Sequence, residues 1–524
     1  MKTIKIASFY LFACLLFLSA CKNDVTFKED ALVTVPAEVN SVTAFHPNQL
    51  MEKADFKSFQ QQELYQNILK RVAETDPSFA AILKDPTESG IDLDKNIYIN
   101  THISSEVMGE TFTYAIASIK DKSKLDAFLN AATNIEDFPN GKLSLQKGNI
   151  VFAWNDKNVL IGKSSIYNGD SKAWAKKIFA TTQETSIAGN ADLKAHLASG
   201  HDITNWTNST SLASNPQVVM MAGMINISES DLKDNSILSY IDFEKGSVVG
   251  KSDFKLKKGL TKDVDLLFKD KVKTDFSPFI PSKDLVLVTT AALDWKGLNQ
   301  VLSEQSLSKS MIDRNLRQYG INTSELTSIL EGDLIFAGYG KQADSKEIDK
   351  SIFIAPIADE ALLRKALGVA IQYEMIEKID EQTYLINMDK FRSGKQGNID
   401  ISFDSGKLLI KDKMLFITGN EALLNQLREG ELPQAERISK KRLSDMSGYI
   451  ASGIMDVFAM GKFSPSVWNE KIENIKFDAT RKAANFNLNM VDKNNNSLKS
   501  FLQYLNEAYK NDQFQLDLDL NKTM

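Results

Sequence analysis

One plan of strands and helices occurs twice along this chain of 524 residues, and that recurrence most constrains its fold. At residues 36–47 a proline is followed by an apolar strand, and residues 280–289 repeat this order. A recurring pattern predicts one structural unit built more than once. Because each copy is long enough to bury its own core, we predict two tandem, mutually similar modules, at residues 36–278 and 279–524.

Hairpin signatures fall at matching places in the two copies. Residues 149–162 and 407–418 each contain two short apolar runs joined by a polar turn. Strands that follow one another through hairpins and short helices favour an α+β fold with mainly antiparallel sheets and flanking helices. The alternative is an alternating chain whose elements align by chance, because the spacing between the copies varies.

The first twenty residues have the pattern of a secretory signal. Lys2 and Lys5 precede an apolar run at residues 6–18. At 1.5 Å per residue this run is too short for the roughly 30 Å hydrocarbon core of a bilayer. We therefore predict a signal peptide at residues 1–20, and no other segment reaches eighteen apolar residues.

The signal ends in Leu18, Ser19, Ala20 and Cys21, which resemble the lipobox of bacterial lipoproteins. In that family the Cys thiol takes a diacylglyceryl group, cleavage occurs before it, and the new amine is acylated. The resemblance implies this covalent lipid at Cys21, and no other cofactor is expected; the alternative is an ordinary signal peptide. Cys14, the only other cysteine, lies in the removed segment, so we expect no disulfide.

The residues after Cys21 bear on location. Lys22, where many inner-membrane lipoproteins have Asp, favours the outer membrane by family analogy. Residues 22–24 match only part of the export tag of Bacteroidetes surface lipoproteins, which leaves the surface and the periplasmic face open. We interpret residues 21–35 as the lipidated Cys and a polar tether.

The charge of the chain excludes one class of partner. Its 62 basic and 68 acidic residues give a net charge of −6. There is no basic field to attract phosphates, so we expect no nucleic-acid partner.

Signatures of catalysis are missing from the sequence. There is no nucleophile elbow, phosphate-binding loop or clustered Cys/His site. His196 and His201 are five residues apart, which places them on different helix faces, so we predict neither a metal site nor a catalytic residue. Dispersed carboxylates, such as Asp517 and Asp519, leave a glycan hydrolase open.

One stretch is a candidate ligand site. His201, Asn205 and Trp206 combine an imidazole, an amide and an indole, which suit stacking and hydrogen bonding to a sugar. The alternative is a strand that places Ile203 and Trp206 in the core, followed by a polar exit loop.

The lipobox, the strand that opens at Val35 and the segment from Leu193 to Trp206 are similar to a Bacteroidetes outer-membrane lipoprotein family. That family is catalogued only as a domain of unknown function. The resemblance implies an outer-membrane lipoprotein with a duplicated α+β body, and it implies no activity or site residue.

These patterns together favour a lipid-anchored, non-catalytic binding or scaffolding protein of the bacterial outer membrane. The expected partners are the membrane itself and an envelope protein or glycan. Two alternatives stay open: a cell-envelope enzyme, such as a glycan hydrolase with dispersed Asp and Glu, and a periplasmic chaperone-like or export accessory protein.

Overall fold

The computed structural model places most of the chain in two compact units. Unit 1 comprises the described residues within Met1–Val219, Leu232–Lys255 and Asp492–Met524, and unit 2 those within Met220–Asp231 and Leu256–Val491. The structure describes residues 31–75, 77–104, 110–129, 134–146, 149–166, 169–210, 213, 216–224, 227–304, 306–317, 320–340, 351–387, 406–460 and 469–511.

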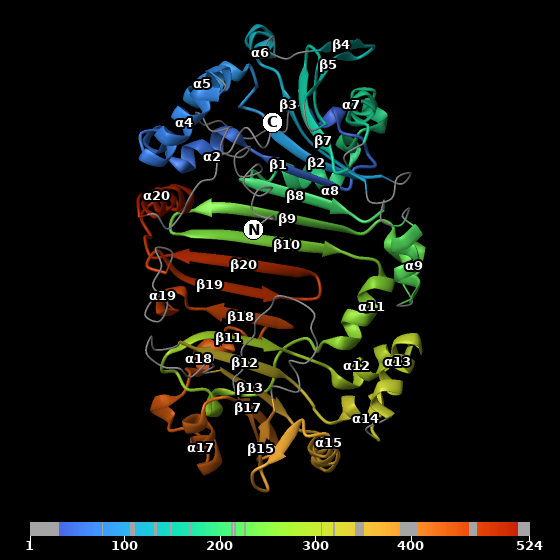
Figure 1. Cartoon of the computed structure of the whole chain (residues 1–524), viewed down its shortest axis with the longest axis vertical. Helices are drawn as coiled ribbons and strands as arrows, with labels where there is room; N and C mark the ends of the chain where they lie inside the picture. Colours follow the sequence, from blue (N-terminus) through green and yellow to red (C-terminus); the bar gives the residue numbers. More distant parts are fainter. Residues whose placement is uncertain are drawn as a thin grey trace. The chain divides into compact units, whose positions relative to one another are not determined.

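Unit 1 is built on a ten-stranded antiparallel sheet, most of whose strands are labelled in Figure 1. In spatial order the strands are β10 (Ser247–Lys255), β9 (Ser236–Glu244), β8 (Ile203–Asn208), β1 (Ser41–Phe45), β2 (Ile97–Ile103), β3 (Thr111–Ser118), β7 (Asn158–Ser164), β6 (Ile150–Trp154), β5 (Gly141–Gln146) and β4 (Ile135–Phe138).

The helices of unit 1 precede, separate or follow these strands along the chain. They are η1 (Ala31–Thr34), α2 (Pro47–Ala54), α3 (Phe56–Gln60), α4 (Glu63–Thr75), α5 (Pro77–Lys84), η2 (Pro86–Ser89), α6 (Lys122–Leu129), α7 (Ser171–Phe179), η3 (Gln183–Thr185), η4 (Ile187–Gly189), α8 (Ala191–Leu197) and α20 (Ser497–Lys510), while α9 (Pro216–Met224) and α10 (Glu229–Leu232) cross the unit boundary.

Unit 2 has a sheet of the same kind, also antiparallel throughout its described strands. In spatial order the strands are β20 (Ala483–Met490), β19 (Ile472–Ala479), β18 (Ala451–Met455), β11 (Leu285–Ala291), β12 (Leu334–Tyr339), β13 (Ser351–Pro356), β17 (Met414–Thr418), β16 (Gly406–Lys411), β15 (Thr383–Ile386) and β14 (Ile376–Lys378).

The helices of unit 2 follow a similar plan. They are α11 (Lys258–Leu267), η6 (Ser277–Phe279), α12 (Trp295–Glu304), α13 (Ser306–Arg317), α14 (Thr323–Ser328), α15 (Glu360–Gln372), α17 (Glu421–Glu429), η7 (Gln434–Glu436), α18 (Lys440–Ser444) and α19 (Val457–Met460). The predicted mixture of helices and mainly antiparallel sheets is therefore confirmed.

Alternation along the strands explains which face of each sheet is buried. In β3, Phe112, Tyr114 and Ile116 point into the main core of unit 1, which also contains apolar residues of α7 and α8. In unit 2 the corresponding core contains Ile352 and Ile354 of β13 together with residues of α17. We call the side of each sheet that packs on this core the inner face, and the opposite side the outer face.

The last described helix, α20, belongs to unit 1 although it follows β20 of unit 2. Leu502 lies in a cluster with residues of α2, α3, α4 and α5, and the Asn506 side-chain oxygen accepts a hydrogen bond from the Leu64 amide at 3.0 Å. Conversely, α11 follows β10 but packs on α12 of unit 2. Gly297 permits that contact, since a Cβ there would lie 1.7 Å from the Leu266 carbonyl oxygen.

Because of this exchange of helices, the two units do not divide at the predicted boundary between residues 278 and 279. Unit 1 ends its second segment at Lys255, and the next 236 residues, Leu256–Val491, belong to unit 2. The apolar stripe of an amphipathic helix identifies a helix but not the core that it covers. For that reason a division along the sequence could not assign α11 and α20.

Residues 31–35 are core residues, which corrects the predicted tether of residues 21–35. Ala31, Leu32 and Val35 are 0% exposed, and the Ala31 amide donates to Ser118 Oγ at 3.1 Å. Ser186 Oγ donates to the Leu32 carbonyl at 2.9 Å. Residues 31–35 are mainly apolar. The prediction grouped them with the polar residues that precede them.

The signal peptide and Leu18, Ser19, Ala20 and Cys21 lie outside the described residues, as do Asp517 and Asp519. Within the described ranges, none of the helices has the length and apolar character needed to cross a bilayer.

Candidate functional site

The three residues of the predicted ligand site do not converge. Trp206 is 2% exposed and lies in the main core of unit 1, while Asn205, its neighbour in β8, lies on the outer face. His201 precedes the strand. The strand alternation therefore turns the indole away from any ligand that Asn205 could contact. The alternative is right for Trp206 but wrong for Ile203, which is half-buried and lies on the outer face with Asn205.

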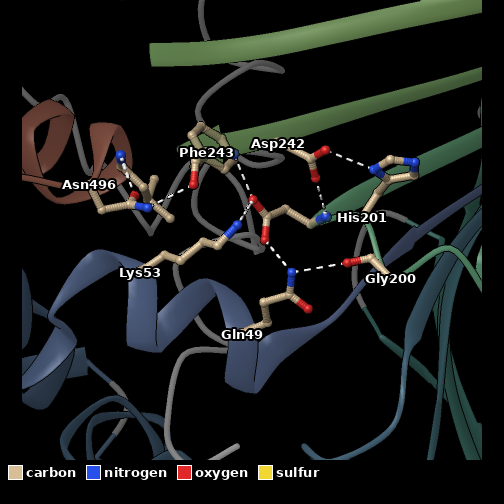
Figure 2. Close-up of polar contacts among 9 residues, drawn as sticks. Gln49, Lys53, Gly200, His201, Asp242, Phe243 and Asn496 are labelled. Atoms are coloured by element: carbon tan, nitrogen blue, oxygen red, sulfur yellow. Dashed lines mark hydrogen bonds and ion pairs between the residues drawn. The ribbon is translucent and has the colours of Figure 1, made fainter. Parts of the chain in front are cut away.

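His201 instead borders a polar network, shown in Figure 2, whose contacts converge on Asp202. The Asp202 side chain is 0% exposed. Gln49 Nε2 donates to its Oδ1 at 2.7 Å, and Lys53 Nζ and the Phe243 amide both donate to its Oδ2 at 2.6 Å. A buried carboxylate is costly unless it is paired, and these three donors supply the compensation.

A second carboxylate extends the network to the imidazole of His201. The Asp202 amide donates to Asp242 Oδ1 at 3.0 Å, and His201 Nδ1 lies 2.7 Å from Asp242 Oδ2. The His201 ring stacks on Tyr240, with centroids 3.6 Å apart and planes 2° from parallel. If Nδ1 carries the proton, Asp242 orients the ring and leaves Nε2 as a base.

The network also reaches the start of α20. Asn496 Nδ2 donates to the Phe243 carbonyl at 2.7 Å, while its Oδ1 caps the helix by accepting from the Leu498 amide at 3.0 Å. Gln49 Nε2 also lies 3.1 Å from the Gly200 carbonyl oxygen. The network thus links α2, β8, β9 and α20 within unit 1, which is a structural role that the local sequence did not reveal.

Of the other histidines, His102 is buried, and His46 and His196 are half-buried. His102 is 2% exposed and lies against the rings of Tyr114 and Trp174. Desolvation lowers the pKa of His102 to about 4, against a favourable effect of Glu38 on the charged form. Burial likewise lowers the pKa of His46 and His196. Among the described residues, no group of three or more His, Cys, Asp or Glu could hold a metal ion.

The outer faces of the two sheets are half-exposed over their middle strands, and they differ in chemistry. Cross-strand partners in unit 1 form a row with a polar centre. From β3 to β10 this polar row is Ala115, Ile99, Thr43, Asn205, Ser239 and Ser252. Asn205 Nδ2 donates to Thr43 Oγ1 at 2.9 Å, and the hydroxyls of Ser239 and Ser252 are 2.8 Å apart.

The same row in unit 2 is aromatic. From β13 to β20 this aromatic row is Phe353, Phe336, Thr289, Gly453, Phe477 and Phe486. Phe477 and Phe486 are 41% and 40% exposed. A Cβ on Gly453 would lie 2.3 Å from the Phe477 ring, so the glycine allows that ring to lie over β18.

The rows on either side of the aromatic row are also mainly apolar. One contains Ser351, Gly338, Leu287, Met455, Ile475 and Leu488, and the other Leu334, Ala291, Ala451, Ala479 and Ala484. We call these three rows together the apolar face of unit 2. None of the residues just named carries a charge.

Of three comparisons with known proteins, the one with family models assigns the chain. A family model described as a domain of unknown function (DUF4836) matches residues 33–429. No curated protein matches the sequence. Two solved structures of TP0453 are similar at 8% identity: crystal form I covers 45% of this chain and 85% of its own, with a TM-score of 0.22, and form III covers 47% and 90%, with a TM-score of 0.21. Scores this low do not assign a fold.

Proposed function

Because the chain belongs to the family described as a domain of unknown function (DUF4836), we propose a function from its surfaces. The protein is a lipid-anchored, non-catalytic binding protein of the bacterial outer membrane, and the apolar face of unit 2 is its binding surface. The observation that carries this proposal is the exposure of Phe477 and Phe486, at 41% and 40%, within an uncharged face.

Contiguous exposed apolar surface is the feature that supports binding. The largest apolar patch that a typical monomeric protein exposes is about 300–600 Å², and such a patch is often functional. Fully burying a phenylalanine side chain stabilises by roughly 1.5–3 kcal/mol, so covering the exposed part of each ring contributes on the order of 1 kcal/mol. The face therefore offers binding energy without any specific polar contact.

The anchor in this proposal is the lipid on Cys21. Several acyl chains are needed for stable membrane attachment, and a triacylated cysteine would supply them. Only ten peptide units separate Cys21 from the buried Ala31, and a fully extended chain of that length spans at most about 36 Å. The tether would thus keep unit 1 close to the bilayer.

We also infer that the two units arose by duplication of one module. The ten strands occur in the same spatial order, and isolated bridges recur at matching places. Pro36 bridges Ser186 in unit 1 as Pro281 bridges Arg437 in unit 2. Matching bridges outside the strands support common descent more strongly than a shared strand order alone.

The anchor is tested by fractionating cells that express the full chain with Cys21→Ala. We expect the variant to leave the outer-membrane fraction and to lose incorporation of a labelled fatty acid. Cys14→Ala is the matched control, since it removes the other cysteine and should stay with the membrane. A Cys21→Ala chain that remains lipid-labelled in the outer membrane would refute the anchor.

Orientation and binding need separate measurements. Protease shaving of intact cells digests a body that faces outward and spares one that faces the periplasm. For binding, Phe477→Ser with Phe486→Ser should lose whatever co-purifies with the wild-type chain, whereas Ser239→Ala with Ser252→Ala should retain it. Equal recovery from both double variants would remove the apolar face as the binding surface.

The His201–Asp242 pair favours a second candidate, the cell-envelope enzyme. An oriented imidazole is the usual general base of a hydrolase. Assays of glycan and peptide hydrolysis with the full chain and with His201→Gln would decide this: activity that His201→Gln abolishes, in a folded protein, would replace the binding proposal.

A further inference from the structure

The size of the apolar face limits what can occupy it. It crosses six strands, which at about 4.8 Å per strand span roughly 24 Å. Its three rows are two residues apart along each strand, so they cover about 14 Å in the other direction. The projected area is therefore on the order of 300 Å².

This area is small for a protein partner. A stable protein–protein interface buries about 800 Å² on each side, and it has a polar rim that supplies hydrogen bonds. Even with allowance for the relief of its side chains, the apolar face falls short of that area. A second copy of this chain docked through the face alone would be held too weakly.

The distribution of polar groups also argues against a protein partner. In the β19–β20 hairpin, polar pairs lie on the inner side: Asn485 Nδ2 donates to Asp478 Oδ1 at 2.6 Å, and Asn489 Nδ2 to Asn474 Oδ1 at 2.9 Å. The outer side of the same hairpin has Phe477 and its partner Phe486. The outer side thus offers dispersion and hydrophobic contact, with no charge to be matched by a partner.

We propose that the apolar face of unit 2 binds the acyl chain of a lipid, which lies along the aromatic row. This deepens the binding function proposed above and names its ligand class. An acyl chain needs no hydrogen bonds from its site, it is narrow enough for three rows, and half a bilayer core of about 30 Å gives its length as about 15 Å. Each buried methylene contributes about 0.8 kcal/mol.

Photo-crosslinking from within the face tests this inference. The full chain would carry p-benzoylphenylalanine in place of Phe477, in intact cells, and the crosslinked products would be identified by mass spectrometry. The matched control carries the same group in place of Ser239, which occupies the equivalent position in the polar row of unit 1. We expect a lipid adduct at residue 477 at least tenfold more abundant than at residue 239.

Other products would overturn the inference. A crosslinked dimer would assign the face to a second copy, and a crosslink to a different polypeptide would assign it to a protein partner. No adduct at residue 477, or equal lipid labelling at both positions, would mean that the face does not select acyl chains. Circular dichroism of both substituted chains would show that they are folded.

The masses also identify the source of the lipid. A free membrane lipid adds its own mass to the peptide that contains residue 477, whereas the lipid of Cys21 joins that peptide to the one containing Cys21. The two proposals can fail separately. A free-lipid adduct together with an unlipidated Cys21 would support the acyl site and refute the anchor. A lipidated Cys21 without a lipid adduct at residue 477 would support only the anchor.

Discussion

The outer faces of the two units have the same backbone plan and opposite chemistry. Where unit 1 has Asn205, Ser239 and Ser252, unit 2 has Gly453, Phe477 and Phe486 at the equivalent positions. The inner-face residues that form the main cores are apolar in both units. Inward residues and backbone pairing therefore specify this fold, while the outward residues are free to acquire a surface chemistry.

Removing the Asp202 carboxylate should destabilise unit 1 more than any other change considered for either unit. Asp202→Ala would leave the Lys53 ammonium, the Gln49 amide and the Phe243 amide without their shared acceptor. Loss of one partner of a buried pair typically costs about 3–5 kcal/mol, and the partial exposure of Lys53 favours the lower end. Hydrogen exchange should rise in α2, β8 and β9 and stay unchanged in unit 2.

Asp253→Ala is the control for that measurement, because Asp253 pairs with Lys251 at the surface. We expect it to change stability by less than about 1 kcal/mol. If Asp202→Ala and Asp253→Ala had equal effects, the network would not hold unit 1 together.

The next effect concerns α20, which follows unit 2 along the chain but packs in unit 1. Leu502→Ala in α20 removes a side chain that is 5% exposed, and such truncations cost about 2–5 kcal/mol. The loss should appear in the exchange of α2 and α4, which belong to unit 1. Faster exchange in β19 and β20 alone would contradict the assignment of α20.

The stability of unit 1 should depend on pH more strongly than that of unit 2, because all four histidines lie in unit 1. Folding lowers the pKa of His102 to about 4, from 6.5, so the unfolded chain binds more protons between these values. Stability of unit 1 should fall as the pH drops from about 6.5 to 4, by on the order of 2–3 kcal/mol. His46 and His196 act in the same direction.

Denaturant unfolding at several pH values, with hydrogen exchange as the local probe, would measure this. His102→Gln should flatten the dependence in unit 1. A stronger acid response in unit 2 over the same range would count against the assignment.

Substitutions at equivalent positions of the aromatic row and the polar row should have small but unequal costs. Gly453→Ala forces the Phe477 ring off β18, because the new methyl would overlap it. We expect a cost of about 1–2 kcal/mol. Asn205→Ala at the equivalent position in unit 1 should cost less than about 1 kcal/mol, since it loses a half-buried hydrogen bond to Thr43 and an exposed one from Thr207. Equal costs in thermal unfolding would show that the ring is not constrained by the glycine.

The sequence predicts much of the fold because its signals are local. Alternation and turn residues located the hairpins of β6 with β7 and of β16 with β17, and they gave the antiparallel fold class. Packing between distant segments has no such signal. The amphipathic pattern of α20 does not say which core it covers, and the buried position of residues 31–35 depends on contacts with Ser118 and Ser186.

The candidate site was predicted less well for the same physical reason. His201, Asn205 and Trp206 are close along the chain, but strand alternation separates Asn205 from Trp206. The donors that surround Asp202 come from residues 49, 53 and 243, far away in sequence. The aromatic row depends on the register of six strands, which only the complete set of pairings reveals.

The place of α20 has a consequence for how the protein is made. During synthesis, unit 1 cannot complete the cluster around Leu502 until almost the whole chain has left the ribosome. Its early segments therefore stay incompletely folded while unit 2 is still being translated. For a chain that crosses a membrane before folding, as the proposed export requires, such a delay keeps it threadable until its final helix arrives.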